Sequence, residues 1–334
     1  MTTSLWQTYQ AAFPIGVAVG GLLPDHYSAA ELEILRTQFC VLTPENCMKP
    51  EAIQPQEGVF TFQQADALAA FARAHGKRMT GHCLLWHQAT PDWFFRDGDQ
   101  PAGRDLLLNR MRRHIQALVG RYRGQIAGWD VVNEAIDDQD AYLRDSPWLR
   151  QAGDDYLVQA FRFAREADPD MQLYYNDYNI ELPVKREKTL RLLASLRDAG
   201  VTVDAVGIQG HWCLDRVPFA EVDAAIGLFA QTGLKVMITE LDISMLPGNE
   251  SAGDPYKDGC PPQLFARQAE QYAELFRIFL RHRDVITRVA FWNLHDGCSW
   301  LNSWPYRRTN YPLLFDRNCH PKLAYEAVLA AGRV

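Results

Sequence analysis

WDVVNE, residues 129–134, is a largely apolar run that ends on a carboxylate, and VMITELD, residues 236–242, repeats that form. Each run predicts a strand buried on both faces, and such a strand has no use for a carboxylate in its interior. A carboxylate at the carboxyl end of a parallel strand lies instead where barrel enzymes keep their catalytic groups. Glu134 and Glu240 are therefore the candidate catalytic pair.

Six further apolar segments have the length of buried strands. With the two above, the predicted strands are residues 15–19, 39–43, 78–84, 126–132, 172–175, 205–208, 236–239 and 288–292. Segments of helical periodicity alternate with them, at residues 65–75, 106–122, 156–167, 185–199, 219–232, 263–282 and 321–331. Alternating strands and helices predict parallel pairing, and eight such units close a barrel. We predict an α/β fold, a (β/α)8 TIM barrel.

The main alternative is a doubly wound open sheet. That fold usually carries a glycine-rich phosphate-binding turn after its first strand. Residues 17–21 (VAVGG) lack the required glycine spacing, which favours the barrel.

Composition favours one domain and excludes several partners. The 334 residues contain no low-complexity or linker-like stretch, so we predict a single catalytic domain over residues 1–334 without a carbohydrate-binding module. The formal net charge is −7 and no basic cluster is dense enough to attract nucleic acid. No stretch approaches the length of a membrane span. The sequence sets no oligomeric state.

The cysteines and the start of the chain bear on the compartment. The seven cysteines are odd in number and form no CxxC pair, which predicts reduced thiols in a reducing compartment. The first residues show no basic segment followed by an apolar one, so we predict a cytoplasmic protein. Without HxH, HExxH or paired cysteines, we expect no metal and no cofactor.

The residues at the predicted strand ends are polar or aromatic. They comprise Glu45, Asn46, Lys49, His82, Trp86, His87, Asn133, Asn176, Asp177, Tyr178, Gln209, His211, Trp212, Asp242, Trp292, His295, Asp296 and Trp300. Amides, carboxylates and a lysine can bond sugar hydroxyls, and flat indoles pack against the apolar face of a pyranose. Two carboxylates from different strands are what glycoside hydrolysis requires. Two long polar connections, residues 136–153 and 244–262, follow the glutamate-bearing strands and are expected to wall a cleft.

Several of these residues also have structural interpretations. A strand-end glutamate can be an ion-pair partner, although two in such strings make that reading weaker. His82 and His87 can be satisfied core histidines. Trp6, Trp93 and Trp148 lie away from strand ends and are predicted to pack, and Tyr174 and Tyr175 are expected in the core or behind the site.

Five sequence blocks together resemble the family 10 glycoside hydrolases, whose main activity is endo-β-1,4-xylanase. They are residues 45–51 (ENCMKPE), 58–62 (GVFTF), 82–87 (HCLLWH), 129–134 (WDVVNE) and 238–242 (ITELD). The resemblance runs from residues 13–16 (FPIG) to 312–316 (PLLFD). It implies a (β/α)8 barrel and a retaining mechanism, and with the predicted compartment it implies an intracellular member.

The resemblance also implies roles. Glu134 would be the general acid/base and Glu240 the nucleophile, with His211 bonded to Glu240 and oriented by Asp242. Asn133 would bond the sugar 2-hydroxyl. The glycone subsites would be lined by Glu45, Asn46, Lys49, His82, Trp86 and Gln209. Trp292 and Trp300 would crowd the ring at the cleavage point, and Tyr178 would face the leaving group.

The chain departs from the common family pattern at two positions, both bearing on outer subsites. Asn293 stands where glycine is frequent, and Trp212 where an aliphatic residue is frequent. The expected substrate is xylan fragments and xylo-oligosaccharides. Alternatives are another retaining barrel glycosidase, such as a β-glucanase or an exo-acting xylosidase, or a barrel that only binds sugar. A binding-only barrel would normally have lost Glu134, Glu240 or His211, and all three are present.

Overall fold

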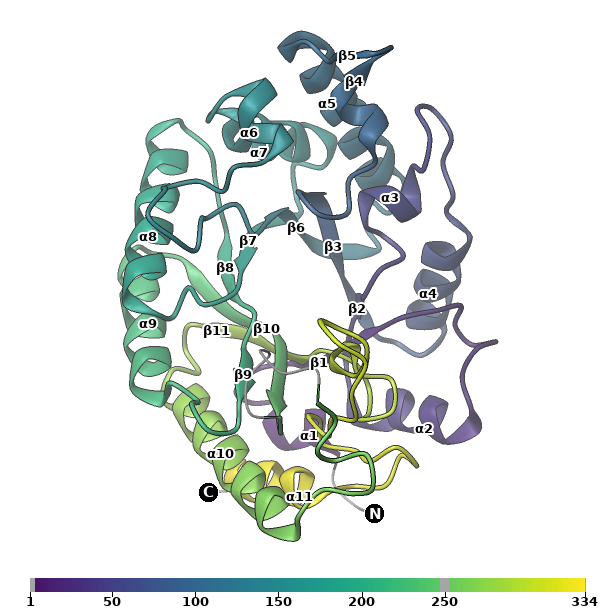
Figure 1. Cartoon of the computed structure of the whole chain (residues 1–334), viewed down its shortest axis with the longest axis vertical. Coiled ribbons are helices and arrows are strands. Elements are labelled where there is room, and N and C mark those ends of the chain that lie inside the picture. Colours follow the sequence, from purple (N-terminus) through teal and green to yellow (C-terminus); the bar gives the residue numbers. More distant parts are fainter. Residues whose placement is uncertain (1–3, 247–252, 334) are drawn as a thin grey trace.

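A closed ring of parallel strands forms the centre of the molecule (Figure 1). The computed structural model describes residues 4–246 and 253–333. Within them the ring consists of β1 (Ile15–Val19), β2 (Val41–Pro44), β3 (Arg78–Trp86), β6 (Ile126–Asn133), β7 (Gln172–Asp177), β8 (Ala205–Ile208), β10 (Lys235–Ser244) and β11 (Ile286–Phe291). Pairing of β11 with both β10 and β1 closes it. The predicted (β/α)8 barrel is confirmed.

Helices surround this ring (Figure 1). The long ones are α2 (Ala29–Gln38), α4 (Gln63–Ala74), α5 (Arg104–Arg121), α7 (Tyr156–Ala167), α8 (Pro183–Asp198), α9 (Phe219–Gln231), α10 (Pro262–Arg281) and α11 (Leu323–Ala331). Shorter elements are α1 (Leu5–Tyr9), α3 (Pro50–Ile53), α6 (Pro147–Ala152), the 3₁₀ helices Asp92–Phe95 and Trp300–Asn302, and the hairpin of β4 (Arg96–Asp97) and β5 (Gln100–Pro101).

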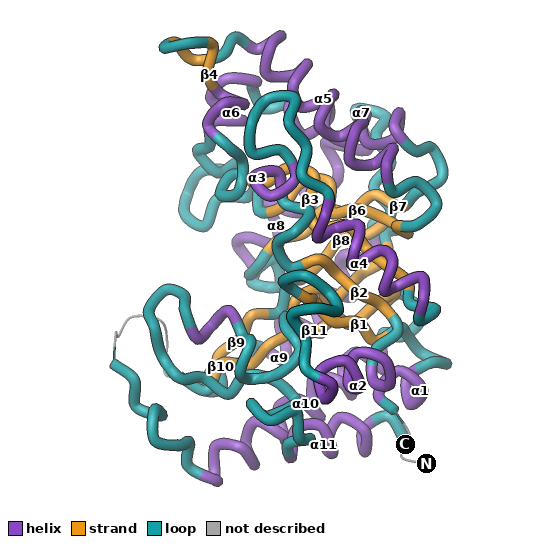
Figure 2. Tube along the Cα trace, turned by 90° about the vertical axis from the view of Figure 1, so that its right-hand side faces the viewer, coloured by secondary structure: helices purple, strands orange, loops and turns teal. Residues whose placement is uncertain are grey.

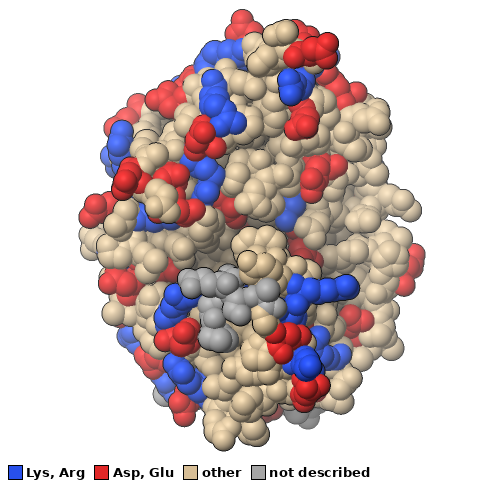
Figure 3. Space-filling view, in the orientation of Figure 1, with Lys and Arg blue, Asp and Glu red and all other residues tan. Residues whose placement is uncertain are grey.

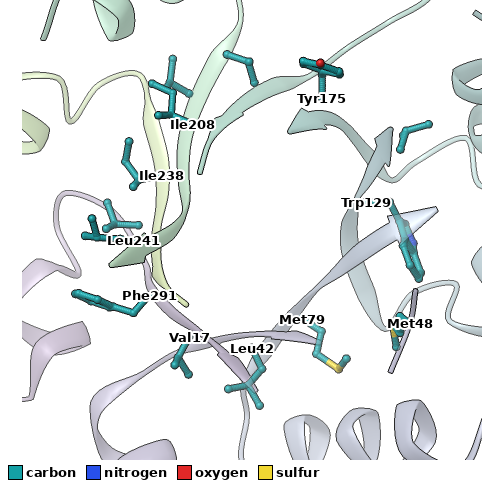
Figure 4. Close-up of a cluster of buried hydrophobic side chains, with 14 of the residues drawn as sticks. Val17, Leu42, Met48, Met79, Trp129, Tyr175, Ile208, Ile238, Leu241 and Phe291 are labelled. Atoms are coloured by element: carbon teal, nitrogen blue, oxygen red, sulfur yellow. The ribbon is translucent and has the colours of Figure 1, made fainter. Parts of the chain in front are cut away.

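The main core lies between strands and helices. Figure 4 shows apolar side chains pointing outward from the ring, among them Trp129, Ile208 and Phe291. Trp129 is almost fully buried and lies flat on β3 at Gly81, where an added Cβ would come within 2.1 Å of the indole. The side chains that alternate with this layer point into the barrel, where Tyr174, Ala205 and Met237 form a separate cluster. This alternation delivers polar side chains to the barrel interior.

Three predictions need correction. The strand that carries Glu240 does not stop there: β10 continues to Ser244 because β9 (His211–Cys213) pairs with its end. The helix α2 was missed; it begins at a Ser28 capping box, and its weak apolar stripe of Ile34 and Leu35 gives little periodicity. The second strand begins at Val41 rather than at residue 39.

The structure describes the first of the two predicted long connections completely and the second in part. The connection at residues 136–153 contains α6, which begins after Ser146 as its N-cap. Of the connection at residues 244–262, residues 247–252 lie outside the described part. Trp6, Trp93 and Trp148 pack against the core as predicted.

In the side view, β9 and β10 lie on the opposite side of the molecule from the two chain termini (Figure 2). On the face seen in Figure 3, Lys and Arg are interspersed with Asp and Glu rather than gathered in one patch. Among the described helices, none is both long and apolar enough to cross a bilayer.

Candidate active site

Glu134 follows β6 directly and turns its carboxyl into the barrel mouth. Its φ is +59°, in the left-handed region that residues with a side chain rarely adopt. Oε2 accepts a hydrogen bond from Trp86 Nε1 at 2.9 Å, and Oε1 accepts one from Gln209 Nε2 at 3.0 Å. Asn133 Nδ2 donates to Oε1 at 3.3 Å. All three side-chain donors are neutral.

These surroundings favour the protonated form of Glu134. Burial, followed by the negative charge of Asp177 and that of Glu240, raises the pKa of Glu134 above its ordinary value. The hydrogen bonds from Gln209 and Trp86 act in the opposite direction but do not reverse the shift. A buried carboxyl of raised pKa is suited to act as a general acid.

Glu240 lies within β10 and is equally buried, but its partners differ. Oε2 is 3.0 Å from His211 Nε2, and Oε1 accepts from Asn176 Nδ2 at 2.8 Å. Burial alone would raise the pKa of Glu240; the hydrogen bond from His211 and the positive charges of His82 and His211 outweigh it and lower the pKa below its ordinary value. Glu240 is therefore held as a carboxylate.

His211 is fixed between two carboxylates. Its Nδ1 lies 3.0 Å from Asp242 Oδ2, while Nε2 faces Glu240. Burial would lower the pKa of His211, but Asp242 and then Glu240 raise it to about 10, so both ring nitrogens carry protons at neutral pH. Trp300 Nε1 also donates to Asp242 Oδ2 at 2.8 Å. His211 therefore lies between Glu240 and Asp242, the two residues with which the resemblance pairs it.

Asn176 connects the two glutamates and was not assigned a role from the sequence. Its Nδ2 donates to Asn133 Oδ1 at 3.0 Å as well as to Glu240, and its Oδ1 accepts from Thr239 at 2.6 Å. A Cβ at Gly207 would approach Asn176 Oδ1 to 2.4 Å, so this position of β8 has no room for a side chain. The position of Asn176 directly after a predicted strand was the signal in the sequence that it belongs to the site.

Several residues assigned to the glycone subsites contact one another or other aromatic residues of the site. Lys49 Nζ donates to Asn46 Oδ1 at 2.8 Å and lies 4.7 Å from the centre of the Trp86 ring. His82 is buried and bonded to Asp130 at 2.9 Å, and its ring meets Trp292 edge-on at 5.2 Å. His82 is thus satisfied as a core histidine would be, yet its charge also acts on Glu240.

Glu45 and Asn293 meet beside this group. Burial raises the pKa of Glu45, and Asn293 counteracts this by a hydrogen bond to its charged form. Asn293 has φ +81° and accepts from Trp300 N at 2.9 Å. Asparagine tolerates the left-handed conformation better than most residues, which explains how it can occupy a position where the resemblance leads one to expect glycine.

The aromatic residues divide into three settings. Trp292 is buried near His82 and His211, and Trp300 lies 4.9 Å from the His211 ring and stacks on the half-exposed Trp304. Tyr178 contacts three charged side chains, those of Arg144, Asp138 and Lys185.

Trp212 has a structural contact outside the group around the two glutamates. Trp212 is buried, and its Nε1 donates to Glu181 Oε1 at 2.7 Å. Within the described residues, no group of three or more His, Cys, Asp or Glu side chains is arranged to hold a metal ion.

Comparison with known proteins identifies the family of the chain. The family model of glycosyl hydrolase family 10 matches residues 4–331. An endo-1,4-beta-xylanase of Geobacillus stearothermophilus is 43% identical over 333 residues, with 98% of each chain covered. A solved mutant in complex with xylotriose is 40% identical with a TM-score of 0.94, covering 98% of this chain and 99% of that one. The intracellular xylanase TsXylA from Thermoanaerobacterium saccharolyticum is 40% identical with a TM-score of 0.87, covering 97% and 98%. The chain belongs to glycosyl hydrolase family 10.

Proposed function

We propose that this chain is a retaining endo-1,4-β-xylanase that hydrolyses β-1,4-xylosidic bonds in xylan fragments and xylo-oligosaccharides. Glu240 is the nucleophile and Glu134 the general acid/base. The observation that carries the assignment is the difference between the partners of two buried carboxyls. Glu240 is bonded to His211 and Asn176, which lowers its pKa, whereas Glu134 accepts from the neutral side chains of Trp86, Gln209 and Asn133 and its pKa is raised. Both retaining and inverting glycoside hydrolysis require one carboxylic acid and one carboxylate at the same bond, and membership of glycosyl hydrolase family 10 supports the retaining form.

In the first step a Glu240 oxygen attacks the anomeric carbon and forms an ester. The bond from that carbon to the leaving sugar breaks, and the departing oxygen takes the proton of Glu134. Positive charge develops on the ring in the transition state, and the carboxylate of Glu240 stabilises it. His211 keeps Glu240 ionised and holds its other oxygen away from the sugar, since that oxygen is 3.0 Å from Nε2.

In the second step Glu134 acts as a base. Once Glu240 is an ester its negative charge is gone, and one of the causes of the raised pKa of Glu134 is removed. Glu134 then takes a proton from water while the water oxygen attacks the anomeric carbon. The ester bond breaks and Glu240 leaves as the carboxylate, which returns both groups to their starting states.

Xylose is favoured because it lacks a hydroxymethyl group. Trp292 and Trp300 both border His211, so their indoles stand beside the ring that Glu240 attacks. One similar solved structure contains xylotriose. The likeness to the intracellular TsXylA, together with the seven scattered cysteines, supports a cytoplasmic role on short xylo-oligosaccharides.

Digestion of xylotetraose by the wild type and by Glu240→Gln tests the proposal. We expect xylobiose from the wild type and no product from the variant, because an amide cannot serve as the nucleophile. Glu274→Gln is a matched control, since Glu274 is partly exposed and forms an ion pair with Arg277 within α10. Stepwise release of xylose would show an exo-acting enzyme, and absence of any cleavage by the wild type would favour another substrate or sugar binding alone.

A further inference from the structure

The backbone of Glu134 adopts a conformation that its own sequence does not favour. A residue with a side chain pays a steric penalty at φ +59° and stays there only where its surroundings enforce it. β6 ends at Asn133, and the last backbone bond to β7 is that of the Glu134 amide, which donates to Asn176 O at 2.9 Å. Other contacts must fix the peptide groups on the carboxyl side of Glu134.

Side chains of β7 hold the amides of this segment. Tyr175 Oη accepts from Ala135 N at 3.1 Å and from Ile136 N at 3.2 Å. Asp177 Oδ2 accepts from Ile136 N at 3.3 Å and from the Tyr175 hydroxyl at 2.6 Å. All of these groups are buried. The amides that follow the acid/base are therefore anchored to the next strand of the barrel.

A single guanidinium holds the carbonyls. Arg144 Nε donates to the Glu134 carbonyl oxygen at 3.1 Å, and Nη2 donates to the Ile136 carbonyl oxygen at 3.2 Å. Arg144 reaches this place because its own amide donates to Ala135 O at 2.8 Å, which closes the connection after β6 into a compact turn. Its side chain is 19% exposed.

The same guanidinium extends to the side assigned to the leaving group. Nη2 also donates to Tyr178 Oη at 2.8 Å and to Asp138 Oδ2 at 2.9 Å. Lys185 bridges Asp138 and Asp177 at 2.8 Å each, so the carbonyl and amide contacts belong to one network. Only an arginine can supply this many donors in a fixed planar arrangement.

We propose that Arg144 is a positioning residue for the proton transfer: it fixes the backbone of Glu134 and thereby the direction of its carboxyl. This rests on the proposed role of Glu134 as acid/base. Among the described residues, the donors to the carboxyl itself are Trp86, Gln209 and Asn133, all of them neutral, so its direction depends on the peptide from which it extends. A shift of that peptide would misdirect the proton and leave Glu240 untouched.

Two aryl β-xylobiosides separate this role from a general effect on the fold. Dinitrophenolate departs without protonation, whereas phenolate needs the proton of Glu134, and the sugar bound is the same in both. The ratio kcat/KM reports only the steps up to ester formation. It therefore measures the acid role of Glu134 without its later role as a base.

For Arg144→Met we expect kcat/KM to fall about tenfold to a hundredfold on phenyl β-xylobioside, the size of effect that a displaced catalytic group produces. On 2,4-dinitrophenyl β-xylobioside we expect a fall of less than about threefold. Arg144→Lys, which keeps the charge but cannot hold both the carbonyls and Tyr178, should show the same selectivity at smaller size. It also carries the test if Arg144→Met does not fold.

Two references keep the outcomes distinct. Glu134→Ala should show the same selectivity in stronger form, and Arg150→Met, which removes an exposed arginine paired with Asp145 in the same connection, should act as the wild type. If the wild type cleaves neither xylobioside, or Glu134→Ala shows no selectivity, the proposed function fails. If both behave as expected but Arg144→Met and Arg144→Lys lose activity equally on the two substrates, or not at all, the positioning role is contradicted.

Discussion

Glu134 and Glu240 are two carboxyls of nearly equal burial, 8% and 5% exposed, whose acidities are shifted in opposite directions. Burial by itself would raise the pKa of both carboxyls. The difference lies in the partners: Glu134 receives hydrogen bonds from uncharged side chains and faces the negative charge of Asp177, whereas Glu240 is bonded to a doubly protonated imidazole. Burial therefore does not distinguish the two proposed roles. The charges of the neighbouring side chains distinguish them.

The largest expected effect comes from removing that imidazole. His211→Asn takes away the positive charge, so the pKa of Glu240 should rise and the acid limb of the kcat/KM profile should move to higher pH. We expect kcat to fall about 10²–10³-fold, as for the loss of one preorganised electrostatic contact. An acid limb that stays in place would show that His211 does not set the ionisation of Glu240. His320→Asn, at an exposed histidine, is the control.

The same variant should change how stability depends on pH. The pKa of His211 in the folded state, about 10, lies above its ordinary value of 6.5, so its stabilising contribution is complete below about pH 6.5 and disappears as the pH rises through about 10. Urea unfolding should therefore show the destabilisation by His211→Asn to be larger at pH 6 than at pH 10. A difference that is constant with pH would mean that the ion pairs of His211 do not contribute.

Asn176→Ala should have the next largest effect. It removes a donor to Glu240 and the bond to Asn133, which couples the two catalytic strands. We expect kcat on xylotetraose to fall about tenfold to a hundredfold, because a neutral donor is lost while His211 remains. Asn318→Ala, in an exposed turn, controls for the substitution itself. A fall larger than that of His211→Asn would reverse the ranking of charged over neutral partners.

A smaller change is expected when a hydrogen bond to Glu134 is removed. Trp86→Phe keeps an aromatic ring but removes the hydrogen bond to Glu134 Oε2, which lowers the pKa of Glu134. Its loss should raise that pKa, so the basic limb of the profile should move to higher pH. One neutral hydrogen bond should change kcat/KM by about twofold to tenfold. Movement of the basic limb to lower pH would contradict the neutral-donor account of Glu134.

The smallest effect concerns which sugar is accepted. Trp300→Ala should raise kcat/KM on aryl β-cellobiosides relative to β-xylobiosides by roughly threefold to tenfold, because a wall beside the ring is removed. Trp300 also bonds Asp242, so Trp300→Phe, which loses that bond but keeps a ring, separates the two contributions. An unchanged ratio in Trp300→Ala would refute the indole wall as the basis of xylose preference.

Much of the fold was accessible from the sequence because parallel strands buried on both faces are continuous apolar runs. All eight were placed, and both glutamates were found where such runs meet polar residues. The prediction was wrong about the end of β10, because β9 extends it by pairing Asp242 with His211, a contact between segments about thirty residues apart that no local pattern reveals.

The roles of Asn176 and Arg144 could not be predicted for the same reason. Asn176 acts through Asn133 and Glu240, which are 43 and 64 positions away in the chain. Arg144 resembles any arginine of a polar connection until the turn after β6 places its guanidinium against Glu134. Sequence identifies groups that react, whereas the groups that orient them become visible only when the strands are assembled.

The most direct test of the comparison is a carboxyl titration by NMR with ¹³C-labelled glutamate, in the wild type and in Glu240→Gln. We predict that Glu240 titrates below and Glu134 above the ordinary value of 4.5, and that the Glu134 pKa falls when Glu240 becomes neutral. If Glu134 loses its proton at a lower pH than Glu240, or if its titration is the same in both proteins, the charge of the neighbours does not divide the roles of the two glutamates.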